Sequence, residues 1–282
     1  MEAMFRTIGH TFELMKMSWS VLMKDRELIL FPFMSAIGVL IVIGLFFGVA
    51  AATGSLDRLD TATGSQSTEQ AQPIDLILAV ALYASTTFVV IFFNAALVAA
   101  ALERLRGGDP NVSSGLRAAA AHLPAIVVWA LISATVGLIL QILRDKMDNF
   151  IGQIVIGMIG GVWAYMTFFV VPVLVAEGAG PIEGIKRSAG LFQRTWGRQV
   201  ASSFGFGLVY IIAVLVAFLP AALIFAISPL AGIVVGAILI PLAIGTVQAM
   251  EGIFKAALYE FALGETPREF DRGTLSGAYR AL

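Results

Sequence analysis

The feature that most limits how this chain can fold is a series of long apolar stretches, the clearest of which runs from Gln199 to Phe225 without a formal charge. At about 1.5 Å per residue, a helix of that length crosses the roughly 30 Å of hydrocarbon in a bilayer. Comparable stretches recur, so 59% of the residues are hydrophobic and only 13% are charged. Soluble proteins carry about 25% charged residues. The sequence therefore predicts an all-α integral membrane protein.

Six spanning helices are expected from the lengths of these stretches. They cover residues 28–52, 75–102, 124–143, 151–176, 199–225 and 230–263. We predict one membrane domain over residues 1–263 and a charged, peripheral cytoplasmic tail over residues 264–282. Pro172, Pro220 and Pro241 lie inside three spans, where they either bend the helix or break it and shape a cavity.

A basic amphipathic segment precedes each pair of spans: residues 3–24, a short segment from Ser113, and the segment after Gly178. In each, apolar residues recur at helical spacing and charged residues occupy the other side. The pattern predicts three interfacial helices, each with one face toward lipid and one toward water. The expected apolar residues are Phe5, Ile8, Phe12, Met15, Trp19 and Leu22; Leu116, Ala120 and Leu123; and Ile185, Ala189, Phe192 and Trp196.

The distribution of Lys and Arg predicts how the chain is oriented. Fifteen of these residues lie on the side of the amphipathic segments, and three, Arg58, Arg144 and Lys146, lie in the opposite loops. Because basic loops stay in the cytoplasm, both termini are expected there. An even number of spans agrees with this orientation.

The even-numbered spans end in similar sequences. These are Gly107-Gly108-Asp109-Pro110, Gly178-Ala179-Gly180-Pro181 and Gly264-Glu265-Thr266-Pro267, and two of them continue as Gly115-Leu116-Arg117 and Gly184-Ile185-Lys186. A threefold internal repeat of one interfacial helix and two spans explains the pattern. The general tendency of helices to stop at Gly and Pro explains it equally well. Both explanations stay open.

Two amphipathic sequences also carry a resemblance. FRTIGHTFELMKMSWSVLMKDRELILFPF near the N-terminus and GPIEGIKRSAGLFQRTWGRQ in the centre resemble matching segments of an uncharacterised family of prokaryotic six-span membrane proteins. They are also distantly similar to the membrane domain fused to some glycerophosphodiester phosphodiesterases. The resemblance implies a multi-pass topology in a prokaryotic cytoplasmic membrane and an association with lipids. It implies no catalytic residues.

Polar residues within spans are candidate functional residues, because burying them in lipid is costly. Asn94 in the second span and Gln248, Glu251 and Lys255 in the sixth lie near the cytoplasmic ends of their helices. Glu251 and Lys255 are four residues apart, which suits an ion pair. The group is either a headgroup or ion site, or a structural pair that holds the sixth span against the second.

Basic and small residues give two further sets of candidates. Anionic lipid is expected to contact Lys16, Lys24, Lys186, Arg187, Arg194 and Arg198. Close helix packing, within one chain or between copies, is expected at Gly44/Gly48, Gly157/Gly161 and Gly232/Gly236. Membrane lipids are thus the expected partners, with a second copy or another membrane protein as a further possibility.

The residue types argue against catalysis. The chain has no cysteine and two histidines, His10 and His122, so we expect no metal, no cofactor and no enzymatic activity. No basic nucleic-acid-binding domain is present either. Two functions remain: a non-catalytic membrane protein that organises lipids or partners, or a channel. The expected channel lining is Asn94, Thr167, Ser202, Ser203 and Tyr210.

Overall fold

The computed structural model describes residues 15–56, 72–147, 149–196, 205–265, 267–268 and 270, and the side chains of 195–196 and 205–208 are not described. Over these ranges the chain is almost entirely helical and contains no strand. A first helix covers residues 15–24. It is followed by η1 (Arg26–Ile29), α2 (Leu30–Ala52), α4 (Pro73–Leu105), α5 (Val112–Ala121), α6 (Leu123–Lys146), α7 (Phe150–Thr167), α8 (Val170–Glu177), α9 (Pro181–Trp196), α10 (Gly205–Ile227) and α11 (Pro229–Ala262).

Six helical segments are long and apolar enough to cross a membrane, which confirms the prediction of six candidate spans. They are Arg26–Ala52, Pro73–Leu105, Leu123–Lys146, Phe150–Glu177, Val209–Ile227 and Pro229–Ala262. Most of their ends lie within a few residues of the expected ones. The expected start of the fifth span, at residues 199–204, lies outside the described residues.

Of the three prolines inside spans, only Pro172 interrupts its helix. The fourth span is divided into α7 and α8 at Phe168 and Phe169, four and three residues before this proline. Pro172 has no N–H to bond the carbonyl of Phe168, and its ring crowds that carbonyl. At this break, the N–H of Phe169 donates to Ser188 Oγ of α9 at 2.9 Å. Pro220 and Pro241 lie within continuous helices, so of the two predicted alternatives a break does not occur there.

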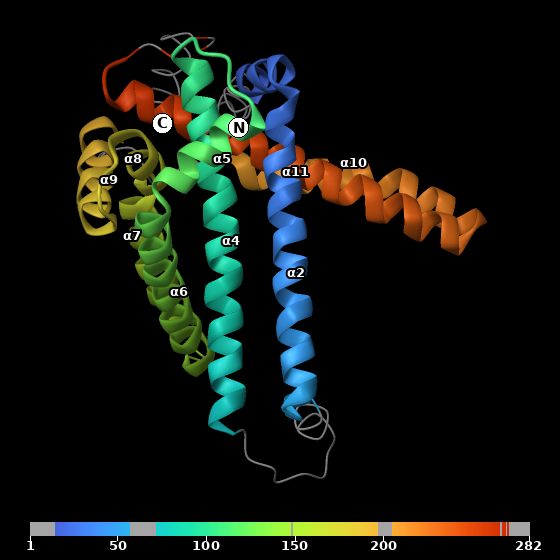
Figure 1. The fold of residues 1–282 in the computed structure, drawn as a ribbon. Helices are drawn as coiled ribbons and strands as arrows, with labels where there is room; N and C mark the ends of the chain where they lie inside the picture. The colour runs from blue at the N-terminus through green and yellow to red at the C-terminus, as the bar shows by residue number, and fades with distance from the viewer. Residues whose placement is uncertain are drawn as a thin grey trace.

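The helices meet at one end of the molecule and diverge from it (Figure 1). The main buried core lies at this end. It is formed by the 15–24 helix, the start of α2, residues 95–105 of α4, α5, α8, α9 and residues 249–259 of α11. We call this region the hub. We call the remaining apolar lengths of α2, α4, α6, α7, α10 and α11 the arms.

The six candidate spans do not all run in one direction. The hairpin of α10 and α11, orange in Figure 1, extends across the direction of α2 and α4. Two glycines let α11 cross close to those helices. A Cβ on Gly245 would lie 3.3 Å from the Phe33 ring of α2, and one on Gly252 would lie 2.5 Å from Leu97 of α4. The sixth span therefore contributes its second half to the hub and its first half to an arm.

The helices predicted to be amphipathic pack on protein more than the sequence predicts. In α9, Leu191 and Phe192 are buried, and the Phe192 ring centre lies 4.2 Å from that of Tyr165 in α7. In α5 the buried residues are Gly115 and Ala119. The apolar faces expected to contact lipid therefore help to build the hub. The exposed residues in these helices include Trp19, Ala120, Lys186 and Arg194.

The start of the C-terminal tail also belongs to the hub, which corrects the expectation of a peripheral segment. Phe270 is buried in the main core, and Pro267 is buried as well. The N–H of Arg268 donates to the carbonyl of Leu105 at 3.1 Å, at the end of α4. This segment thus joins the end of α11 to the end of α4.

The three similar span ends share a backbone conformation. Gly107, Gly178 and Gly264 have positive φ angles of 92°, 65° and 89°. Such a left-handed residue is the usual way to end a helix at glycine. Beyond two of these ends, Gly115 and Gly184 are each the fourth residue of a short helix, α5 and α9. Because common helix-ending chemistry also produces this pattern, the threefold repeat stays a prediction.

Candidate functional site: a charged layer in the hub

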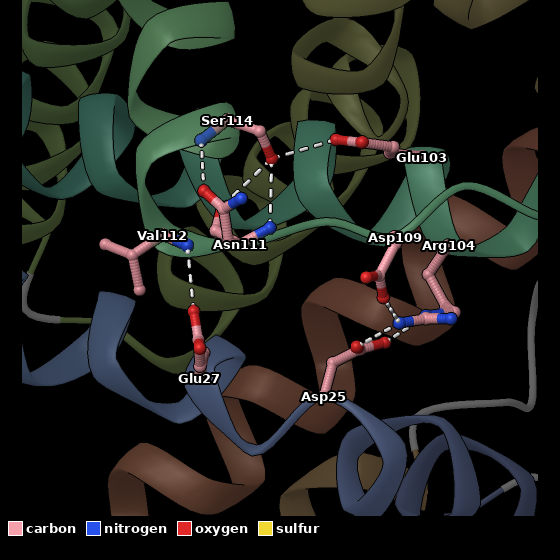
Figure 2. A network of polar contacts seen from close by, with 8 residues as sticks. All are labelled: Asp25, Glu27, Glu103, Arg104, Asp109, Asn111, Val112 and Ser114. Carbon is pink, nitrogen blue, oxygen red and sulfur yellow. Dashed lines mark hydrogen bonds and ion pairs between the residues drawn. The ribbon is translucent and has the colours of Figure 1, made fainter.

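Most of the ion pairs in the described residues lie in the hub, and the first is centred on Arg104 (Figure 2). This residue is in the last turn of α4, and its guanidinium contacts both carboxylate oxygens of Asp25, which precedes η1. Its Nη2 also lies 2.7 Å from Asp109 Oδ1. The Asp25 side chain is 7% exposed, whereas Asp109 is 96% exposed. Arg104 therefore neutralises a buried carboxylate.

Polar contacts next to Arg104 also fix the start of α5. Asn111 accepts the N–H of Ser114 at 2.9 Å, and the Ser114 hydroxyl donates to Glu103 Oε2 at 2.9 Å. The N–H of Val112 donates to Glu27 Oε2 of η1 at 3.2 Å (Figure 2). A carboxylate at a helix N-terminus satisfies a free N–H and opposes the helix dipole favourably. These contacts tie α4, η1 and α5 together.

A second group of charges ties α11 to its neighbours. Glu260 is 4% exposed, and its carboxylate lies 2.7 Å from Arg106 Nη2 at the end of α4. Next to it, the buried Tyr259 donates its hydroxyl to Glu177 Oε1 of α8 at 2.8 Å. Glu177 also lies 3.1 Å from Arg187 Nε of α9. Each carboxylate is thus balanced by a cation from another helix.

The predicted polar cluster is found in part. Lys255 Nζ lies 2.7 Å from Glu251 Oε1, as the four-residue spacing predicts. Tyr210 of α10 donates its hydroxyl to Glu251 Oε2 at 3.0 Å, and Lys255 Nζ lies 5.7 Å from the Phe168 ring centre. Among the described hydrogen bonds, none links Asn94 or Gln248 to this pair, and Gln248 is exposed. The cluster joins α10, α11 and the break between α7 and α8.

The predicted lipid contacts are mostly exposed side chains. Lys16, Lys24, Lys186 and Arg194 are exposed on the 15–24 helix and α9. Arg187 is exposed too, but it pairs with Glu177, and Arg198 lies outside the described residues.

Only one of the three predicted glycine pairs packs within the chain. A Cβ on Gly232 would lie 2.4 Å from Phe225, and one on Gly236 would lie 3.4 Å from Ala221, so this pair brings α10 and α11 together. The other two pairs lie on the arms, where an added Cβ would meet nothing within 4 Å. These glycines are Gly44, Gly48, Gly157 and Gly161. Packing of those two pairs within one chain is therefore not found.

In the described part of the chain, no cluster of three or more His, Cys, Asp or Glu residues could hold a metal ion. His122, between α5 and α6, has its Nδ1 2.9 Å from the Ala118 carbonyl of α5. His10 is outside the described residues.

The sequence reasoning missed the partners of Asp25, Tyr259 and Glu260. A signal was present, because Glu103-Arg104-Leu105-Arg106 places four residues, three of them charged, at the end of an apolar span. Their pairing partners lie up to 154 residues away in the chain, so sequence spacing does not reveal them.

Comparison with known proteins gives a family. A model of a family of unknown function, DUF6159, matches residues 74–268. No curated protein and no solved structure matches the chain. The comparisons show no link to the membrane domain of glycerophosphodiester phosphodiesterases. The matched region runs from the first turn of α4 to Arg268, which bonds back to α4, and it covers more than half of the sequence. The protein therefore belongs to the DUF6159 family of unknown function.

Proposed function

We propose that this chain is a non-catalytic integral membrane protein that organises lipids or partner membrane proteins around a rigid hub. One observation carries the proposal. In the most apolar 18-residue stretch of each candidate span, only 0–22% of the residues are buried inside the chain. A chain that enclosed a substrate site or a pore within its spans would bury more of them. The spans here offer most of their apolar surface to the surrounding membrane.

The hub is the rigid part of this proposal. Several charged side chains of the hub form ion pairs that hold helices together. They are those of Asp25, Arg104, Glu177, Arg187 and Glu260. No carboxylate among them is left as a free acid or base for catalysis. Their role is therefore structural, and interaction with the membrane falls to other residues.

Anionic lipid headgroups are the proposed partners on the hub side, which we place at the cytoplasmic face of a prokaryotic cytoplasmic membrane. Support comes from the exposed Lys16, Lys24, Lys186 and Arg194, and from the excess of basic residues on this side of the chain. Each cation near an anionic surface contributes on the order of 1 kcal/mol.

Lipid selectivity tests this proposal. The purified chain is reconstituted in phosphatidylcholine vesicles that contain a trace of spin-labelled phosphatidylglycerol or spin-labelled phosphatidylcholine, and the motionally restricted fraction is measured. We expect a larger fraction for phosphatidylglycerol, which falls as salt rises because screening weakens the attraction. Replacing the four exposed cations with Gln should remove the difference. The charge-conserving control, K16R/K24R/K186R/R194K, should keep it. Equal fractions for both lipids in the parent protein would overturn the lipid proposal.

The channel alternative gains no specific support. Thr167 donates its hydroxyl to the Trp163 carbonyl of its own helix, and Tyr210 donates to Glu251. Neither contact joins two of the expected lining residues, and Ser202 and Ser203 lie outside the described part of the chain. Selective solute flux in the same vesicles, lost on Asn94→Ala and Tyr210→Ala, would favour the channel and contradict the organising role.

A further inference from the structure

The hairpin of α10 and α11 is held together by a defined register. Gly232 meets Phe225, and Gly236 meets Ala221, at distances that leave no room for a side chain at Gly232. The two contacts advance by four residues in opposite directions, as two antiparallel helices require. Extending this register toward the hub places Pro220 beside Ala237 and Val216 beside Pro241.

This register brings two weak points of the backbone to the same level. Pro220 has no N–H, so the carbonyl of Val216, four residues earlier, lacks its helical donor. For the same reason Pro241 leaves the carbonyl of Ala237 without a donor. Both prolines lie inside continuous helices. The hairpin therefore loses one helical hydrogen bond in each helix over a single turn.

The base of the hairpin is fixed to the hub. Tyr210 donates to Glu251 at 3.0 Å, and Gly245 lies against Phe33 of α2. Beyond the prolines, the hairpin is exposed except where α10 and α11 contact each other. The exposed large apolar residues beyond this level are Leu223, Phe225, Ile227, Leu230, Ile233 and Val234.

The straight hairpin carries this apolar surface only part of the way into the membrane. When α2 and α4 stand along the membrane normal, the hairpin starts at the hub and slopes across that direction, with its tip at about the level of the middle of α2 (Figure 1). A helix with apolar residues on all sides has no face suited to water, and burial in hydrocarbon is its favourable state. A distal part that bends toward the membrane normal reaches deeper into the hydrocarbon than the distal part of a straight, oblique hairpin.

We propose that Pro220 and Pro241 form a double-proline hinge, about which the distal half of the α10–α11 hairpin bends from its oblique direction deeper into the hydrocarbon. The moving part has about eight residues per helix, and it is roughly 12 Å long at 1.5 Å per residue. The proximal part stays on the hub through Tyr210 and Gly245. This hinge goes beyond the proposed organising function and does not depend on it.

Distances between two spin labels test the hinge directly. The chain has no cysteine, so a Thr53→Cys, Ser228→Cys variant carries labels only at the outer end of α2 and at the tip of the hairpin. Double electron–electron resonance in lipid nanodiscs should give a broad distance distribution with a short-distance population. Adding Pro220→Ala and Pro241→Ala restores both helical hydrogen bonds. We expect this change to remove the short-distance population and narrow the distribution.

The control is Pro124→Ala in the first turn of α6, where a missing N–H breaks no helical hydrogen bond. It should leave the distances unchanged. The immersion depth of a single label at Ser228→Cys, from oxygen and nickel-chelate accessibility, gives a second readout. We expect a deep label in the parent and a shallower one in the Pro220→Ala, Pro241→Ala variant. Identical distances and depths in parent and double variant would overturn the hinge.

Discussion

The hub and the arms of this protein bury their apolar residues in different ways. In the hub, large side chains such as Phe31, Phe169 and Tyr259 are fully buried against one another, and charges are paired across helices. On the arms, side chains such as Leu40 and Ile151 are exposed within the chain and rely on the membrane for cover. Mutations should therefore destabilise the hub through lost complementarity and leave the arms almost unaffected.

The largest expected effect is the loss of the buried cation. Arg104→Ala leaves the Asp25 carboxylate buried without a partner, which typically costs about 3–5 kcal/mol in the free energy of unfolding. Unfolding in mixed detergent micelles, followed by circular dichroism, measures this loss. Arg117→Ala removes an exposed arginine from α5 and serves as the matched control. Equal stability of the two variants would show that the Asp25–Arg104 pair does not hold the hub.

The next largest effect is expected at the tail. Phe270→Ala removes a buried ring from the main core, and such truncations cost about 3 kcal/mol or somewhat more. The same unfolding experiment reports the change. If the tail were peripheral, as the sequence alone suggests, the variant would unfold like the parent.

Glycine substitutions compare the two regions most directly. A Cβ at Gly115 would lie 2.7 Å from the Ala96 carbonyl oxygen and 2.7 Å from Phe31 Cζ, so Gly115→Ala should cost about 1–3 kcal/mol. Gly157→Ala on α7 meets nothing within 4 Å and should be neutral or stabilise by up to about 1 kcal/mol, because Ala favours helix. A loss of stability at Gly157 would mean that another chain packs there.

The smallest expected effect is at the base of the hairpin. Tyr210→Phe removes one hydrogen bond to Glu251, and interhelical hydrogen bonds in membranes contribute about 0.6 kcal/mol on average. A double-mutant cycle with Glu251→Gln isolates this coupling energy. A coupling near zero would indicate that Lys255 alone satisfies Glu251.

Much of the fold follows from the sequence, because apolar length is a local property. Six spans, the Glu251–Lys255 pair and the helix ends at Gly107, Gly178 and Gly264 could all be predicted. The packing of the hub could not. Asp25 and Arg104 are 79 residues apart, and Phe270 looks like a tail residue until the chain folds back on α4. Such contacts depend on how helices cross, which periodicity within one helix does not specify.

The central claim is that the arms formed by α2, α4, α6 and α7 cross the bilayer and the hub remains on one side of it. Because the chain lacks cysteine, Lys186→Cys on α9 and Arg144→Cys in the last turn of α6 can each be labelled with a membrane-impermeant maleimide in right-side-out and inverted vesicles. We predict that Lys186→Cys reacts only in inverted vesicles and Arg144→Cys only in right-side-out vesicles. Reaction of both positions in the same kind of vesicle would contradict the membrane arrangement described for this protein.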